Sequence, residues 1–157
     1  MRILLTELYD VEPEYVNAAS TDSITDADAT LVIGDPAMRR QPDGEAVFDL
    51  GETWTAWTGL PFVFAVWVAN RTLPTAAALG VHTSLIESRN WGLAHLDVLA
   101  REAAAKTGVA EAACADYLAG LDYGLSYPHL GGLTEFYRRL TLAGRVAPGR
   151  LSFLPAA

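Results

Sequence analysis

One apolar segment, residues 62–69 (FVFAVWVA), constrains the fold of this chain more than any other part of the sequence. The segment is rich in Val, Phe and Trp, and the turn sequence TGLP at residues 58–61 comes directly before it. An unbroken apolar run of this length and composition is typical of a β-strand that is buried on both faces. We therefore expect neighbouring strands beside it and packed layers above and below it.

The sequence before this segment predicts shorter elements. Residues 48–51 read as the end of a short strand, and residues 52–57 as one or two helical turns. The earlier part predicts a helix over residues 1–9, short strands over residues 14–18 and 31–33, a helix from Ile24 and a helix from Pro36.

After Asn70 the apolar spacing changes to the period of a helix. We expect four helices, over residues 74–89, 91–106, 109–121 and 130–143, the last beginning at His129 or Leu130. Pro74 suits the first turn of the first helix, and Gly108 and Gly144 are stop signals. Residues 150–154 predict either a short strand or a disordered tail.

Four motifs together resemble one family. They are LVIGDPA at residues 31–37, DLGE with TGLPFVFAVW over residues 49–67, DYLAGLDY at residues 116–123 and GGLTEFY at residues 131–137. The chain is similar to the chorismate dehydratases of the futalosine route to menaquinone, and the resemblance covers nearly its whole length. The dihydroxynaphthoate synthases of the same route share the fold but usually have a catalytic His where this chain has Gly34, which favours the dehydratases.

The resemblance implies a two-lobed α/β fold of the periplasmic-binding-protein type II, present in part. Residues 1–58 would form most of the second lobe, residues 59–70 the hinge and the returning buried strand, and residues 71–157 the helical part of the first lobe. The helix at residues 1–9 has no preceding residue to cap it. We expect the family's N-terminal portion, with its anion-binding turn and its Asn and Ser positions, to have no counterpart in this chain.

The resemblance also indicates where a substrate would bind. The residues that match the family's motifs there are Gly34, Asp35, Pro36, Ala37, Thr58, Gly59, Pro61 and Phe62. No catalytic residue can be carried over, so catalytic residues stay unassigned. Gly34 allows a ligand to approach the backbone closely, and Phe62 is a candidate floor for an apolar pocket.

Each of these residues also has a purely structural interpretation. Asp35 before Pro36 is ordinary helix capping, which we favour over contact with a substrate hydroxyl. Thr58 and Gly59 fit a plain turn as well as a cleft. The pair Arg138-Arg139 near a helix C-terminus is typical of a solvated face, and Cys114 among alanines is typical of a small core residue.

Composition narrows the class of partner. The chain has 19 acidic and 11 basic residues, a net charge of -8 and no basic stripe, which argues against nucleic acid and anionic membranes. One cysteine excludes an internal disulfide and a cysteine-rich zinc site. The three histidines, His82, His95 and His129, show no i, i+4 pair, so we expect no metal. The dehydration that the resemblance implies needs no cofactor. No signal peptide or membrane segment is visible, which favours a cytoplasmic protein.

These observations leave two main hypotheses. In the first, the protein is a lyase that converts chorismate to 3-[(1-carboxyvinyl)oxy]benzoate and water. In the second, it is a truncated, inactive remnant or fragment that self-associates or binds small carboxylates. A binding protein for small acids is a third and weaker hypothesis. The apolar content of 51% and the open edge of the expected strand at residues 62–69 predict a homo-oligomer.

Overall fold

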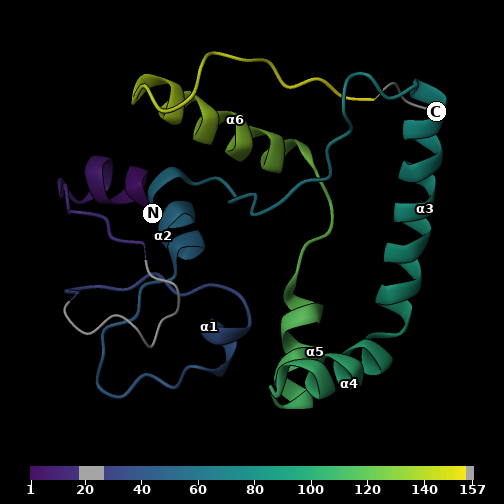
Figure 1. Ribbon diagram of the computed structural model, residues 1–157, viewed down its shortest axis with the longest axis horizontal. Helices are drawn as coiled ribbons and strands as arrows, with labels where there is room; N and C mark the ends of the chain where they lie inside the picture. The colour runs from purple at the N-terminus through teal and green to yellow at the C-terminus, as the bar shows by residue number, and fades with distance from the viewer. Residues whose placement is uncertain (18–26, 155–157) are drawn as a thin grey trace. The chain divides into compact units, whose positions relative to one another are not determined.

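The computed structural model describes residues 1–17 and 27–154. Its elements are helical, in the order η1 (Leu4–Leu8), α1 (Asp35–Arg39), α2 (Leu50–Thr58), α3 (Thr75–Ala94), α4 (Leu96–Thr107), α5 (Glu111–Gly120) and α6 (Tyr127–Leu142), as Figure 1 shows. The helix predicted from Ile24 begins outside the described residues.

The chain divides into two compact units. The first consists of Met1–Asp10, Phe48–Ala94 and Asp122–Ala157, and the second of Val11–Val47 and His95–Leu121. The boundaries at residues 58 and 70 that the resemblance implies stay a prediction.

The α/β fold predicted from the sequence is wrong, because the structure contains no β-strand within residues 1–17 and 27–154. Residues 62–69 form an irregular connection between α2 and α3 (Figure 1), and Phe64, Trp67 and Val68 are exposed instead of buried. A strand exists only when its backbone groups bond to a neighbouring strand, and no described segment provides that ladder. The predicted periplasmic-binding-protein-like architecture needs a β-sheet, so this prediction is wrong for the same reason.

The other predicted strands are also absent from the described residues. Residues 31–33 are irregular, with Leu31 and Ile33 exposed, and residues 14–17 and 150–154 are irregular too. Residues 48–51 are not the end of a strand, because Asp49 begins a helix instead. Its carboxylate accepts a hydrogen bond from the backbone N–H of Glu52 at 2.8 Å, which caps α2.

The helical predictions are confirmed in type and differ at their ends. Of the four helices predicted after Asn70, the first two correspond to α3 and α4. However, α3 continues through Arg89 and Trp91 to Ala94. The third corresponds to α5. The fourth, α6, begins at Tyr127, two or three residues before the predicted start at His129 or Leu130, because Ser126 stands at its N-cap and Pro128 fits its first turn. Gly108 ends α4 with a positive φ of 72°, as its stop signal predicts.

Each unit has a small core. In the first unit the buried apolar residues include Trp54 of α2, Leu4 of η1 and Leu133 of α6. In the second unit α4 and α5 pack together around Ala100, Val109 and Cys114. Cys114 is thus a buried core residue, as predicted.

Candidate active site at the turn after α2

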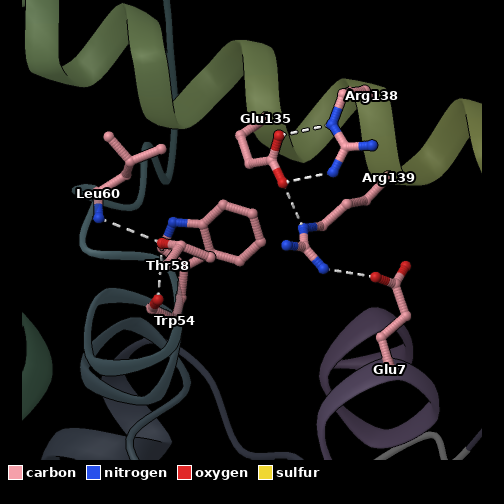
Figure 2. A network of polar contacts seen from close by, with 7 residues as sticks. All are labelled: Glu7, Trp54, Thr58, Leu60, Glu135, Arg138 and Arg139. Carbon is pink, nitrogen blue, oxygen red and sulfur yellow. Dashed lines mark hydrogen bonds and ion pairs between the residues drawn. The ribbon is translucent and has the colours of Figure 1, made fainter.

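The turn that ends α2 holds two of the predicted binding residues. Gly59 has a φ of 69° and its N–H bonds to the carbonyl of Thr55, so it is a left-handed cap that a residue with a Cβ would strain. The hydroxyl of Thr58 donates to the carbonyl of Trp54 at 2.8 Å and accepts from the N–H of Leu60 at 3.2 Å. Figure 2 shows both bonds. The hydroxyl therefore holds the turn closed.

Phe62, the next predicted residue, lies in a cluster of aromatic rings. Its ring centroid is 5.7 Å from that of Trp54, 5.3 Å from Phe136 and 5.0 Å from Phe64, all in edge-to-face arrangements. Such pairs stabilise by roughly 0.5–1.5 kcal/mol beyond the burial of their area. Trp54 is 1% exposed, and its indole N–H has no hydrogen-bond partner among the described residues.

Pro61 fastens the turn onto α6. Its carbonyl oxygen lies so close to Gly132 that a Cβ on this glycine would overlap it. Gly131, one residue earlier, faces the side chain of Leu60 at an ordinary contact distance. The glycine pair of α6 thus lets the backbone of residues 60–61 approach the helix closely.

A network of charged side chains lies beside this turn (Figure 2). Arg139 of α6 donates to Glu7 of η1 at 2.5 Å and to Glu135 at 2.7 Å. Its guanidinium also lies 3.8 Å from the ring centroid of Trp57. Arg138 makes two further bonds to Glu135, at 2.6 and 2.7 Å. Two guanidinium groups face two carboxylates, so the network carries no net charge. Through Glu7, Trp57 and Arg139 it joins η1, α2 and α6.

The arginines hold the carboxylate of Glu135 in its charged form. Hydrogen bonds from Arg138, and then the hydrogen bond and positive charge of Arg139, lower the pKa of Glu135 to about 2 from its usual 4.5, against an opposing effect of burial. The same pairing raises the pKa of Arg138. Glu135 is therefore an ionised hydrogen-bond acceptor at neutral pH and is not suited to donate a proton.

The role of Arg139 was not predicted, because the sequence pattern alone is typical of a solvated surface. The prediction placed Arg138 and Arg139 on a solvated face, but the side chain of Arg139 is only 17% exposed and that of Arg138 is 52% exposed. The sequence does contain one sign of the ion pair between Glu135 and Arg139. The two residues stand at i and i+4, the spacing of an ion pair on one helix face. The partner Glu7, from a distant part of the chain, has no such signal.

The other four predicted binding residues lie in the second unit, in one turn at the start of α1. Gly34 has φ 66° and ψ −149°, a backbone conformation that is nearly restricted to glycine. The helix begins at Asp35, so Gly34 occupies the N-cap position, and no side chain caps α1. Asp35 is therefore not the cap that the sequence favoured. Pro36 and Ala37 complete the first turn of α1, as their order in the sequence predicts.

Two contacts attach α1 to the helices of its own unit. Met38 packs against the core of Ala100, Val109 and Cys114. Arg39 donates to the carbonyl of Thr107 at the end of α4, at 2.7 Å. These contacts hold the Gly34–Asp35 turn on a helical support.

No cluster of three or more His, Cys, Asp or Glu side chains that could hold a metal ion occurs in the described residues. Among the helices of the same residues, none is long and apolar enough to cross a membrane.

The sequence matches the model of a family described as menaquinone biosynthesis over residues 1–141, which is most of its length. This chain belongs to that family. It is also similar to the chorismate dehydratase of Thermus thermophilus, with 38% identity over 96 residues. The aligned part is 61% of this chain and 35% of the relative, so the chain spans well under half of that relative's length. The family predicted from the GDPA, TGLPFVFAVW and GGLTEFY motifs is thereby confirmed.

Proposed function

We propose that this member of the menaquinone biosynthesis family converts chorismate to 3-[(1-carboxyvinyl)oxy]benzoate and water. The observation that supports the proposal is the 38% identity over 96 residues with a chorismate dehydratase. The substrate and the reaction are taken from that relative.

The reaction needs only modest catalytic assistance from the protein. A ring proton and a hydroxyl group leave the cyclohexadiene together as water, and the ring becomes aromatic. Because aromatisation acidifies that proton, positioning, exclusion of water and a few hydrogen bonds to the leaving hydroxyl and the carboxylates suffice. The reaction as written needs no redox partner, because the atoms and electrons of substrate and products already balance.

The predicted binding residues supply two kinds of group. In the second unit, Asp35 is a carboxylate that accepts a hydrogen bond from a substrate hydroxyl, beside a glycine that leaves the backbone open. In the first unit, Phe62 offers an apolar ring face. The hydroxyl of Thr58 is already bonded to the turn, so we assign Thr58 and Gly59 to shaping the turn after α2, and Pro61 to fixing that turn on α6.

The test is to mix the purified chain with chorismate and to follow the enol-ether product by liquid chromatography and mass spectrometry. Turnover well above the uncatalysed rate is expected. The variant Asp35→Asn, which keeps the size of the side chain and removes its charge, should reduce kcat/KM by about 10-fold or more if this carboxylate orients the substrate. Asp43→Asn, in the exposed loop after α1, is the matched control and should leave the rate unchanged.

Two outcomes would contradict the proposal. Chorismate binding in a calorimeter without any product would favour a binding protein for small acids. A folded chain with neither binding nor turnover would favour the hypothesis that the chain is inactive. If the Asp35→Asn variant is as active as the wild type, the role proposed for Asp35 is wrong, but the proposed reaction is not contradicted.

A further inference from the structure

The segment of residues 62–69 presents an unusually apolar surface. Phe64 is 76% exposed, Trp67 84% and Val68 83%, and Val66 between them is also exposed. Isolated exposed apolar residues are normal, but a continuous row of them marks an interaction surface. The backbone of the segment makes no ladder hydrogen bond with the other described residues, so its N–H and C=O groups are open as well.

The segment is anchored at its start and so is held in place for a partner. Pro61 lies against Gly132 of α6, and Phe62 is fixed among the rings of Trp54 and Phe136. Phe64 leans edge-on against Phe62 at 5.0 Å. After Phe64 the chain forms no further helix until Thr75 begins α3. An anchored chain rich in Val, Phe and Trp has the composition that favours β-pairing.

The distribution of charge favours this segment as the place where a second copy of the chain docks. The net charge is -8, so two copies repel each other over most of their surface. Residues 53–70 contain no Asp, Glu, Lys or Arg and are the longest such run in the sequence. Two copies therefore approach most easily through this run, where apolar burial is opposed by no like charge.

The sequence of the segment is also suited to pairing with itself. In an antiparallel pair related by a two-fold axis at Val66, this residue forms a hydrogen-bonded pair with its own copy, and Phe64 faces Val68 of the other chain. Aromatic and β-branched pairs of this kind stabilise a sheet. On the opposite face of the ribbon, the small Ala65 faces the large Trp67.

We propose that residues 62–69 pair with the same residues of a second copy, which forms a symmetric homodimer through an antiparallel two-stranded ribbon. The ribbon pairs the backbone groups on the facing edges of the two chains and shields parts of Phe64, Trp67 and Val68 from water. This inference concerns association alone and stands or falls independently of the reaction proposed above.

The first experiment measures molar mass by size-exclusion chromatography with light scattering. The full chain should elute with twice the mass of one chain. Val66→Pro removes a backbone donor at the centre of the ribbon and should give a monomer with unchanged far-UV circular dichroism, because Val66 lies outside every helix. Tyr127→Asp, which changes another highly exposed apolar residue, is the control and should remain a dimer. A wild-type monomer, or a dimeric Val66→Pro variant, would overturn the proposal.

The second experiment tests the register. Antiparallel residues that face each other have Cα atoms about 4.5–5.5 Å apart, within the range that a disulfide bridges. Val66→Cys should therefore form a cross-linked dimer on mild oxidation, and Tyr127→Cys should not. The native Cys114 is buried and gives the background. If both variants cross-link equally, the contact is not centred on Val66 and the proposed ribbon is wrong.

Discussion

Two neighbouring glycines of α6 show how much depends on a single Cβ. A Cβ on Gly132 would overlap the carbonyl oxygen of Pro61, whereas one on Gly131 would meet the side chain of Leu60 at 3.5 Å, an ordinary contact. Both glycines lie in the same turn of the same helix. Their difference comes from the backbone that crosses α6 at this point, and helix propensity treats them alike.

This contrast predicts opposite effects of the same substitution. Gly132→Ala should destabilise the protein by about 1–3 kcal/mol, because residues 60–61 must move away from α6. Gly131→Ala should be neutral or stabilise it by up to about 1 kcal/mol, because alanine favours a helix over glycine. Urea denaturation of the two variants and the wild type measures both changes. If Gly132→Ala is as stable as Gly131→Ala, the close approach of Pro61 to α6 is wrong.

At the scale of elements, the start of α6 depends on contacts between residues next to one another in the sequence. The backbone N–H of Ser126 donates to Nδ1 of His129 at 3.3 Å, and the Ser126 hydroxyl lies 2.8 Å from the same nitrogen. Nε2 of His129 lies 3.4 Å from the carboxylate of Asp122. These contacts satisfy polar groups that the first turn of a helix leaves open. They explain why α6 begins at Tyr127, before the apolar spacing alone indicates a helix.

The cap gives a prediction for the whole of α6. Ser126→Ala should lower the free energy of unfolding by about 0.5–2 kcal/mol, the usual cost of losing an N-cap side chain. Ser84→Ala is the matched control, because the hydroxyl of Ser84 bonds back to the carbonyl of Gly80 inside α3 and its loss should be nearly neutral. Thermal unfolding followed by circular dichroism at 222 nm compares the two. Equal stability of both variants would argue against a capping role for Ser126.

At the scale of the whole molecule, the balance between buried and exposed apolar residues is unusual. The two small cores contain few large side chains, of which Trp54 is the most buried, while much of the 51% hydrophobic composition lies at the surface. In this setting, side-chain networks take a larger part in joining elements. The network of Glu7, Glu135, Arg138 and Arg139 joins η1 to α6 across most of the sequence.

This network predicts how stability depends on pH. Because the pKa of Glu135 in the folded chain is about 2 instead of its usual 4.5, the unfolded chain binds more protons between these values. The stabilisation is therefore complete above about pH 4.5 and is lost as the pH falls toward 2. The free energy of unfolding should fall across this window, and less steeply in Glu135→Gln. Chemical denaturation at a series of pH values measures the slope.

The control for this measurement is Glu87→Gln, which changes an exposed carboxylate on α3. Its stability should fall with pH as steeply as that of the wild type, since the other acidic residues are unchanged. If Glu135→Gln shows the wild-type slope as well, the arginines do not hold the charged form of Glu135 in the folded chain.

The sequence by itself determined the helices and the family. Helical spacing, turn glycines and prolines are local signals, and they predicted α2 to α6 with errors only at their ends. The family followed from motifs that are read residue by residue, and the match over residues 1–141 confirmed it.

The contacts between residues that are distant in the sequence were decided only by the tertiary structure. The composition of residues 62–69 indicates a strand, but a strand forms only where another strand supplies hydrogen bonds, and the described residues provide none. Likewise, Arg139 becomes nearly buried because Glu7 and Trp57 meet it from other elements. The cap of α6 involves residues that are close together in the sequence, whereas the contacts of Arg139 join residues that are far apart in it.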